Sequence, residues 1–247
     1  MTKAEIQFVR SLADKRTRDT ERLFIAEGAK LVEEIIASGL TIRHLYTTRP
    51  DCTYHNAALI DAKSMERISQ LKSATDVLAV VEQPHHKLDI KGLGAKLTLA
   101  LDGVQNPGNL GTIIRLADWF GIEDVICSSE CADLYNSKVV QATMGALLRV
   151  KVHYVDDLAA LLRSAATNNT PIYGTLLDGN NIYDDKSLAE RGIIVMGNEG
   201  RGLSDECRSA LTHKLFIPPY PADAPTSESL NVAMATGIIL AEFRRRA

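Results

Sequence analysis

The sequence lacks the features that mark membrane-spanning or secreted proteins. No apolar run approaches the roughly 20 residues that a helix needs to cross a bilayer. The first residues, Met1–Glu5, carry no apolar signal core. Hydrophobic residues make up 45% and charged residues 24% of the chain, which is ordinary for a globular protein. We therefore expect a cytoplasmic protein without a membrane partner.

Cysteine is also scarce, with four residues in the chain. Cys127 and Cys131 are separated by three residues, and no second pair follows them. A structural zinc site usually needs four ligands at tighter local spacing. The pattern therefore favours free thiols in a reducing compartment and predicts no bound metal.

The chain has no excess of positive charge. Its 28 basic and 31 acidic residues give a net charge of −3, so it lacks the strongly basic character of many nucleic-acid-binding domains. Basic residues do cluster locally, at Arg10, Lys15, Arg16, Arg18 and Arg22 and at Arg244–Arg246. Each cluster has two interpretations, an RNA contact or an ordinary helix feature. The helix feature is a solvated face for the first cluster and compensation of a helix dipole for the second.

A polar stretch at residues 83–94, with Pro84, Gly92 and Gly94, divides the chain and is typical of a linker. Before it we expect a small α/β module. The expected helices are Ala4–Leu12, Ala29–Ser38 and Ser64–Leu71, and the expected strands are Leu23–Ala26, Ile42–Thr47 and Val77–Val81.

After the linker, strands and helices alternate. The expected strands are Leu97–Leu101, Asp124–Cys127, Val150–Tyr154, Ile172–Leu176, Ile193–Met196 and Lys214–Ile217. The expected helices are Leu110–Phe120, Lys138–Leu148, Asp157–Ala166, Ser204–Leu211 and Leu230–Arg246. This alternation predicts a parallel sheet with helices on both faces, and ligands bind such sheets beyond the carboxyl ends of the strands.

Two of the loops at those ends have a composition suited to a ligand site. Residues 195–204 run from an apolar strand into a glycine-rich turn that holds Glu199 and ends at a helix cap, Ser204. Ser229 and Asn231 precede a long apolar helix. Glycines allow close approach to the backbone, and helix starts offer free N–H groups. The alternatives are a carboxylate that only closes the turn and polar residues that only cap the helix.

The loop at residues 101–111 resembles a dinucleotide-binding turn but lacks the G-x-G-x-x-G spacing, and the chain has no phosphate-binding P-loop. A nucleotide-dependent enzyme is therefore a weak alternative. Arg115 lies four residues after Gly111 in an otherwise apolar helix. Its guanidinium either pairs with an acid such as Asp118 or grips a phosphate.

Four stretches together resemble the SpoU (TrmH-like) family of RNA ribose 2′-O-methyltransferases, of the SPOUT class. They match the family's motifs in order, and they are Asn109–Arg115, Lys138–Ala146, Met196–Ser204, and Ile217-Pro218 with Ser229–Ala233. The segment Arg22–Gly28 and the helix after it resemble the start of the family's substrate-binding domain.

The resemblance implies an α/β fold of two domains. Residues 94–247 would form a parallel-sheet SPOUT domain with a deep trefoil knot, which binds the cofactor and dimerises. Residues 1–90 would form a small RNA-binding domain with a fold like ribosomal protein L30e. A homodimer with its site near the interface is implied as well.

The activity implied by the resemblance is S-adenosylmethionine-dependent methylation of a ribose 2′-OH in RNA, with ribosomal RNA favoured. A tRNA substrate and a non-catalytic RNA-binding protein are the alternatives. The implied catalytic residues are Asn109, Arg115, Glu199, Ser229 and Asn231. The implied cofactor contacts are Thr175, Leu176, Gly197, Asn198, Ile217 and Leu230.

The chain departs from the family pattern in three places. Residues 219–227 replace a shorter segment that usually carries a glycine, and Thr143 and Ala233 stand where serine is common. The first departure lies beside the expected cofactor contacts, where it would alter cofactor affinity or the choice of RNA.

Overall fold

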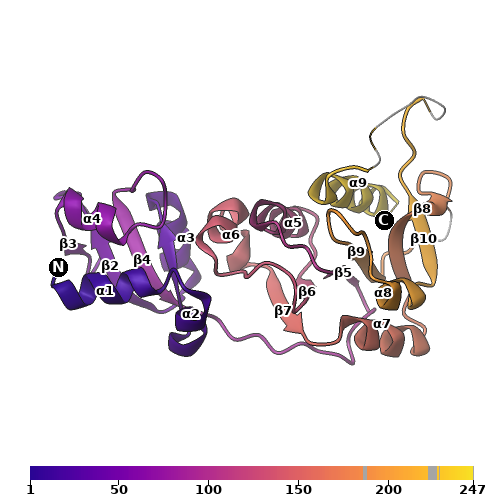
Figure 1. Ribbon diagram of the computed structural model, residues 1–247, viewed down its shortest axis with the longest axis horizontal. Helices are drawn as coiled ribbons and strands as arrows, with labels where there is room; N and C mark the ends of the chain where they lie inside the picture. The colour runs from indigo at the N-terminus through magenta and orange to yellow at the C-terminus, as the bar shows by residue number, and fades with distance from the viewer. Residues whose placement is uncertain (186–187, 222–226, 228, 247) are drawn as a thin grey trace. The chain divides into compact units, whose positions relative to one another are not determined.

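A computed structural model describes residues 1–185, 188–221, 227 and 229–246 (Figure 1). The chain folds into two compact units. The first holds Met1–His85 and Asp133–Leu148, and the second holds His86–Ala132 and the chain from Arg149 onward. The first passage between the units falls inside the 83–94 stretch. Residues 133–148 follow that stretch in the sequence yet belong to the first unit.

A four-stranded sheet forms the middle of the first unit. Its order is β1-β4-β2-β3, with β1 at Leu23–Glu27, β4 at Val77–Glu82, β2 at Ile42–Thr47 and β3 at Ala58–Leu59. The central strand β4 runs antiparallel to β1 and β2. The helices α1 (Lys3–Ser11) and α4 (Ala62–Ile68) share one apolar core with this sheet. Helix α3 (Ala29–Ser38) packs against β1 and β4.

One arginine of the early basic cluster, Arg18, neither lies on a solvated helix face nor is free to contact RNA. Arg18 lies in α2 (Lys15–Glu21), and its side chain is 3% exposed. Its guanidinium contacts Asp133 at 2.6 Å and also donates to the carbonyls of Leu12 and Ala13. A buried charge needs a partner of this kind. Arg18 is therefore a structural residue, neither a solvated face nor an RNA contact.

The segment after Asp133 packs tightly on β1. It forms α6 (Ser137–Thr143) and the short helix η1 (Ala146–Leu148), in place of the single longer helix that the sequence predicts. Met144 and Gly145 separate the two, with φ angles of 50° and 86° in the left-handed region. The φ of 86° favours glycine at residue 145, whereas the Glu34 carboxylate, 2.2 Å from a Cβ placed there, is the end of a flexible side chain that can move.

The second unit contains a six-stranded sheet in which every pairing is parallel. Its order is β10-β8-β9-β5-β6-β7. The strands are β5 (Leu97–Leu101), β6 (Asp124–Ser128), β7 (Lys151–Val155), β8 (Ile172–Asn181), β9 (Gly192–Met196) and β10 (His213–Phe216). The predicted parallel sheet is therefore confirmed, while the trefoil knot stays a prediction from the resemblance.

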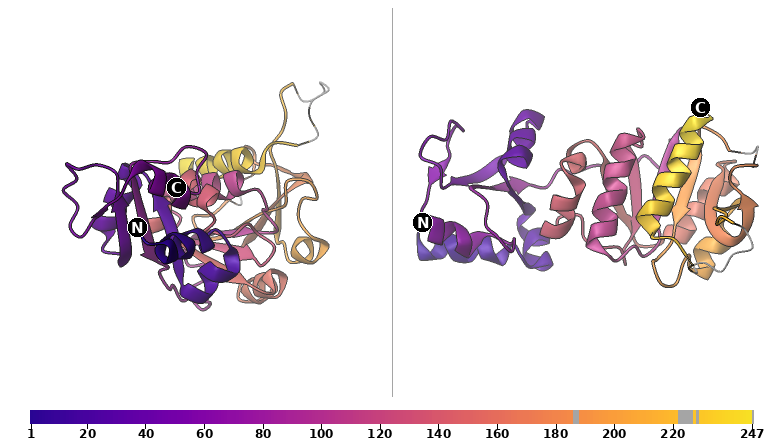
Figure 2. Two further views of the ribbon diagram at one scale, coloured as in Figure 1. Left: turned by 60° about the vertical axis from the view of Figure 1, so that its left-hand side comes forward. Right: turned by 90° about the horizontal axis from the view of Figure 1, so that it is seen from above.

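Helices cover the sheet of the second unit in two pairs. Helix α5 (Pro107–Trp119) packs against α9 (Val232–Arg245), and the two lie side by side (Figure 2). Helix α7 (Leu158–Thr167) packs against α8 (Asp205–Ser209) and shares an apolar core with β5, β6, β8 and β9. Both pairs leave the carboxyl ends of the strands to the connecting loops.

Strand β8 is longer than the sequence predicts, because it continues from Leu176 to Asn181. Its polar end is held by β10, where Leu215 pairs with Asn180 after a shift of register. A Cβ at Gly179 would lie 2.5 Å from the Leu215 backbone, so the strands approach closely there. Pairing with a neighbour, rather than strand propensity, extends this strand.

The arginines at the end of the chain have structural partners. Arg245 and Arg246 both bind Glu242, whose side chain is 6% exposed, and these contacts lower the pKa of Glu242 to about 2. Arg244 donates to the carbonyls of Phe120 and Gly121. The cluster therefore fixes the end of α9, while the Arg245 side chain is 65% exposed and its RNA contact stays an alternative.

The described part of the chain has neither a helix suited to crossing a membrane nor a cluster of metal ligands. No described helix has both the length and the apolar character to span a membrane. In the described part of the chain, no group of three or more His, Cys, Asp or Glu side chains is arranged to hold a metal ion. All four cysteines are free thiols, and three of them are buried, namely Cys127, Cys131 and Cys207.

Candidate active site

Three loops meet through side chains at the carboxyl edge of the large sheet. The Asn109 amide nitrogen, at the start of α5, donates to Glu199 Oε1 at 2.9 Å. The Asn231 amide nitrogen, at the start of α9, donates to Asn109 Oδ1 at 3.0 Å. Glu199, Asn109 and Asn231 therefore form a continuous hydrogen-bonded chain, which we call the Glu-Asn-Asn relay. It joins positions that are distant in sequence.

The direction of every hydrogen bond in the relay is determined. An ionised carboxylate only accepts, so Asn109 must turn its NH₂ toward Glu199 and its oxygen toward Asn231. Asn231 then turns its own oxygen to α9, where it accepts from the N–H groups of Ala233 and Met234. Each amide group keeps one further N–H that the relay does not use. These are the donors that a ligand could meet.

The environment of Glu199 keeps this residue ionised. Burial by itself would raise its pKa, but hydrogen bonds from Asn109 and from backbone amides outweigh burial, and the pKa lies below its ordinary value. One of these amides belongs to Asn106, whose N–H lies 3.3 Å from the carboxylate. Glu199 thus holds both the loop after β5 and the first turn of α5.

The glycine-rich loop after β9 closes on itself. Asn198 and Gly202 exchange two backbone hydrogen bonds of 2.9 Å. The Asn198 side chain accepts from the N–H groups of Gly200 and Arg201, and it donates to the Gly103 carbonyl at 2.6 Å. The Asn198 side chain thus holds the loop, and the expected cofactor contact of this residue stays a prediction.

Gly197 permits this closure. A Cβ at that position would lie 2.4 Å from the Gly202 carbonyl carbon. The glycine therefore serves a close approach between two parts of the same loop, and its expected cofactor contact stays a prediction.

Arg115 stands apart from the relay. It lies on an exposed stripe of α5, whose members are Gly108, Thr112, Arg115 and Trp119. Trp119 is 82% exposed. The ion pair with Asp118 that the sequence offered as an alternative does not form, because Asp118 binds Arg149 at 2.8 Å. Across the described residues, the Arg115 guanidinium has no hydrogen-bond or ion-pair partner. A free, exposed guanidinium is available to a phosphate or to another chain.

The two polar residues before α9, Ser229 and Asn231, have different positions relative to the helix. Asn231 is the helix cap, since α9 begins at Val232 and not at Leu230 as predicted. Ser229 lies two residues before the cap and is exposed. Capping explains the Asn231 oxygen but not its nitrogen, which reaches Asn109. Most of the departure at residues 219–227 lies outside the described residues.

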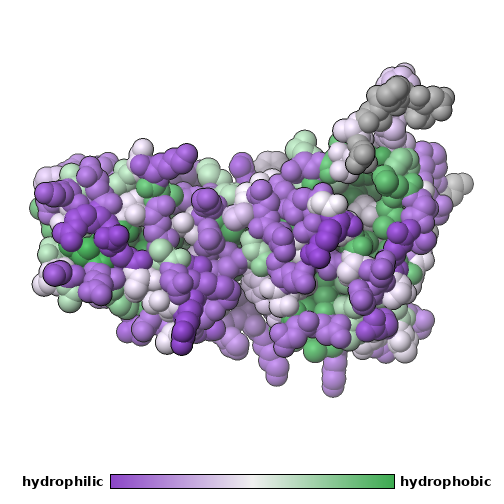
Figure 3. Space-filling model, in the orientation of Figure 1, coloured by the Kyte–Doolittle hydropathy of each residue, from purple (hydrophilic) through white to green (hydrophobic). Residues whose placement is uncertain are grey.

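The other expected cofactor contacts lie at the ends of β8 and β10 and before α9. Thr175 and Leu176 are half-buried on β8, and the Thr175 hydroxyl lies 3.9 Å from the Met196 sulfur of β9. Ile217 follows β10 and is half-buried, whereas Leu230 is 50% exposed. In Figure 3, hydrophobic surface gathers around a hollow over this part of the second unit. Half-buried and exposed apolar side chains at one edge suit a flat, apolar ligand group.

Two residues of this edge were not singled out from the sequence. Asn106 caps α5 by accepting from the N–H groups of Gly108 and Asn109. Asp102 accepts two hydrogen bonds of 2.7 Å from Ser204 and so ties β5 to the start of α8. The Asn-Pro-Gly sequence at 106–108 was a signal for the first, because proline is common just after a helix cap.

The neighbouring hollow on the α7 and α8 side is acidic. It has a volume of about 360 Å³, and its lining includes Asp156, Asp157 and Glu206. The one arginine among its lining residues, Arg201, is paired with Glu130 at 3.0 Å. Negative charge repels phosphate, so this hollow does not suit the backbone of a nucleic acid.

Comparisons with known proteins agree with this architecture. The model of the SpoU rRNA Methylase family matches residues 96–241, and the model of the MRM3-like substrate binding domain matches residues 3–88. The chain belongs to the SpoU rRNA methylase family. The predicted family is therefore confirmed, and with it the expectation of a methyltransferase.

Relatives match along nearly the whole chain. A 23S rRNA (guanosine(2553)-2′-O)-methyltransferase of Bacillus subtilis, RlmP, is 28% identical in an alignment that covers 95% of this chain and 94% of that protein. A TrmH-family RNA methyltransferase structure from Porphyromonas gingivalis has 37% identity and a TM-score of 0.87, covering 100% and 99% of the two chains. An AdoMet-bound rRNA methyltransferase from Sinorhizobium meliloti has 28% identity and a TM-score of 0.86, covering 100% and 96%.

Proposed function

We propose that this protein transfers a methyl group from S-adenosylmethionine to a ribose 2′-OH of ribosomal RNA. The observation that carries the proposal is the Glu-Asn-Asn relay, in which three family motifs meet at the carboxyl edge of a parallel sheet. Ribosomal RNA is favoured over tRNA because the chain carries a substrate-binding domain and because the rRNA enzyme RlmP matches it along nearly its full length.

The residues at the ends of β8, β9 and β10 fit S-adenosylmethionine. Leu176, Ile217 and Leu230 offer apolar contacts for an adenine ring, and Thr175 offers a hydroxyl beside them. The Gly197 loop would hold the remaining polar parts through its backbone. When bound, the cofactor supplies an electrophilic methyl group on a sulfonium.

The relay would orient the ribose. Asn109 and Asn231 each have a spare N–H for the sugar or its phosphate, and Glu199 holds both amides in one orientation. Positioning of this kind can supply much of the rate of a methyl transfer, since the reacting atoms must lie in line. Ser229 lies next to the relay in sequence and would add a hydroxyl contact.

Arg115 would act as an electrostatic anchor. A guanidinium stays protonated at neutral pH, so it serves poorly as a base. It can instead bind the RNA phosphate and stabilise negative charge that develops on the 2′-oxygen as its proton leaves.

We further propose that the active form is a homodimer. The exposed stripe with Arg115 and Trp119 on α5 adjoins α9, where Met234 is 64% exposed. A second copy of the chain that covered this face would bury Trp119 and Met234. It would also bring its own Arg115 to the relay of the first copy. The site would then be complete only in the dimer.

The proposed function is tested by methyl transfer from labelled S-adenosylmethionine to total RNA from a strain that lacks this gene. We expect label in ribosomal RNA and a new 2′-O-methyl-sensitive primer-extension stop. Label in tRNA instead would refute the substrate class and keep the chemistry. Absence of transfer to both naked RNA and isolated ribosomal particles would refute the enzyme activity and leave an RNA-binding protein.

A further inference from the structure

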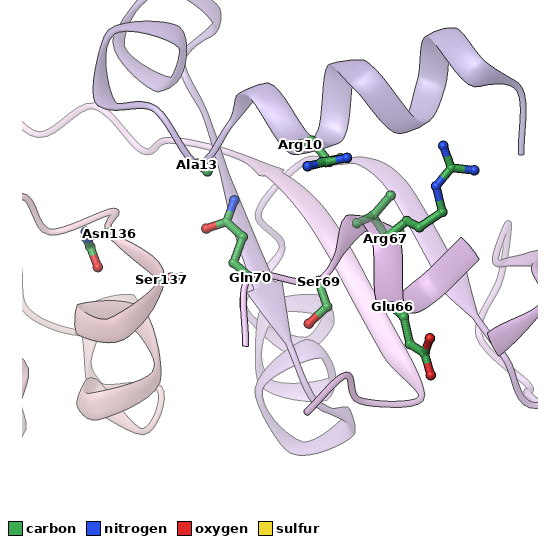
Figure 4. Close-up of a pocket in the computed structure, with 9 residues that line it drawn as sticks. Arg10, Ala13, Glu66, Arg67, Ser69, Gln70, Asn136 and Ser137 are labelled. Atoms are coloured by element: carbon green, nitrogen blue, oxygen red, sulfur yellow. The ribbon is translucent and has the colours of Figure 1, made fainter. Parts of the chain in front are cut away.

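A pocket of about 500 Å³ lies within the first unit, outside the methyl-transfer site (Figure 4). It is bounded by α1, α4, the chain after α4 and the start of α6. Its polar lining residues are Arg10, Glu66, Arg67, Ser69, Gln70, Asn136 and Ser137. Its volume is within the range of about 300 to 1,000 Å³ that small-ligand sites occupy.

Two unpaired cations give the pocket a positive edge. Arg10 extends from α1 and Arg67 from α4, and both side chains are exposed. Neither guanidinium has a hydrogen-bond or ion-pair partner among the described residues. The only acid of the lining, Glu66, points away from Arg10 in Figure 4. The two guanidinium groups are therefore free to bind a phosphate.

The floor of the pocket holds an unsatisfied hydrogen-bond donor. The amide nitrogen of Gln70 is buried, and it has no hydrogen-bond partner among the described residues. Figure 4 shows this amide below Ala13, with its nitrogen toward the chain at Ala13. Such groups are rare, because a buried donor without a partner costs about 1 to 3 kcal/mol. A small shift of the Gln70 side chain would bring its donor to an acceptor in the pocket.

The backbone at Gln70, on one wall of the pocket, is held by hydrogen bonds to a residue of β1. The buried Glu27 carboxylate accepts from the Ser69 hydroxyl at 2.6 Å and from the Gln70 N–H at 2.8 Å. On the opposite wall, Asn136 accepts from the Lys138 N–H at 3.0 Å, which leaves its NH₂ group for a ligand. Two amide groups thus lie across the pocket on supported backbone.

We propose that this pocket binds one unpaired nucleotide of the RNA substrate. The phosphate would lie between Arg10 and Arg67, and the base would enter the pocket, where Gln70 and Asn136 would contact its hydrogen-bonding edge. Single-stranded RNA is recognised in this way, by bases that leave the stack and meet amide side chains. The proposal rests on the proposed function for the identity of the substrate.

The first test measures binding of the full chain to a short fluorescein-labelled single-stranded RNA over a range of salt concentrations. We expect R10A/R67A to weaken binding about tenfold and to reduce the slope of log affinity against log salt by about one. Q70A should weaken binding without changing the slope. The matched control is R16A, an exposed arginine of α2 outside the pocket, which should bind as the wild type does. Equal affinity and slope for R10A/R67A and wild type would overturn the proposal.

The second test locates the nucleotide. Photo-cross-linking with the same RNA carrying 4-thiouridine should label peptides that contain residues 66–70 or 136–137, and R10A/R67A should remove that label. Cross-links confined to other peptides would contradict the proposal. Displacement of the RNA by free nucleoside monophosphates at comparable concentration would also contradict it, and would indicate a small-molecule site.

Methyl transfer separates this proposal from the proposed function. R10A/R67A should raise the KM for RNA about tenfold with kcat nearly unchanged, because the pocket and the relay share no residue and belong to different units. If the wild type methylates RNA and R10A/R67A has the same KM for RNA, the pocket proposal fails and the proposed function stands. If the wild type methylates no RNA, the proposed function fails, and the binding and cross-linking results still decide the pocket.

Discussion

The side-chain amide of Asn109 donates to the Glu199 carboxylate at 2.9 Å, across 90 residues of sequence. This contact joins the start of α5 to the loop after β9. It also fixes the orientation of the Asn109 amide, because a carboxylate accepts hydrogen bonds and cannot donate them. The same orientation presents the Asn109 oxygen to Asn231. One contact thus determines the direction of the whole relay.

Asn109→Asp should therefore disable the relay. It places a carboxylate against Glu199, and the repulsion turns the side chain away from its partners. We expect kcat for methyl transfer to fall by about 10² to 10³, the usual effect of losing a donor at a reacting centre. The control is Asn168→Asp, at the residue that caps the C-terminus of α7, which should keep its activity. Unimpaired turnover in Asn109→Asp would mean that the relay does not orient the substrate.

Gly197→Ala tests the close approach within the loop after β9. The new Cβ would lie 2.4 Å from the Gly202 backbone, so the loop must open. We expect the affinity for S-adenosylmethionine, measured by titration calorimetry, to fall at least about tenfold. Gly200→Ala in the same loop is the matched control, because its nearest neighbour would be the Asn198 oxygen at 3.7 Å. An equal loss of S-adenosylmethionine affinity in both variants would show that the close approach at Gly197 is not the cause of the loss.

Arg115→Lys should lose most of the turnover at saturating RNA, because an ammonium cannot reproduce the bidentate geometry of a guanidinium. Its melting temperature should stay unchanged, since Arg115 is exposed and has no described partner. Near-wild-type kcat would remove the special role of the guanidinium.

The same residue tests the proposed dimer. Mixing Arg115→Ala with Asn231→Ala should restore part of the activity if the arginine acts across the interface, since one mixed site then has both residues intact. The measurement is methyl transfer after co-expression, with each single variant as a control. No restoration would place Arg115 in the same chain as its relay.

Glu242→Gln tests the ion pairs at the end of α9. The pKa of Glu242 is lowered to about 2 from an ordinary value of 4.5, so its ionised form stabilises the fold above pH 4.5. We expect the free energy of unfolding at neutral pH to fall by about 2 kcal/mol. The difference from wild type should shrink as the pH falls from 4.5 toward 2, where wild-type Glu242 takes up its proton.

The control for this prediction is Glu123→Gln. Its partner is Lys96, and both side chains are about half exposed. An exposed pair contributes at most about 1 kcal/mol, so this variant should unfold nearly as the wild type does. Urea titrations over a range of pH make the comparison. A pH-independent difference for Glu242→Gln would refute the ionic explanation.

Much of the fold was predictable from local pattern. The strands Leu97–Leu101 and Ile42–Thr47 and the helix Ala29–Ser38 have the bounds that the sequence indicates. The parallel sheet with helices on both faces followed from the alternation of elements. Errors occurred where a neighbour decides the local structure. Strand β8 extends because β10 pairs with it, and α6 ends early because Met144 and Gly145 are left-handed.

The sequence by itself determined the family, the class of enzyme and the loops in which chemistry-bearing side chains lie, because motif spacing and hydrophobic period are local properties of the chain. Only the tertiary structure decided what those side chains do. It buried Arg18 against Asp133 and joined Glu199 to Asn109, and it turned the Asn198 side chain into its own loop. The physical reason is that a side chain's role depends on its partner, and each of these partners, apart from those within the Asn198 loop, lies about 90 or more residues away.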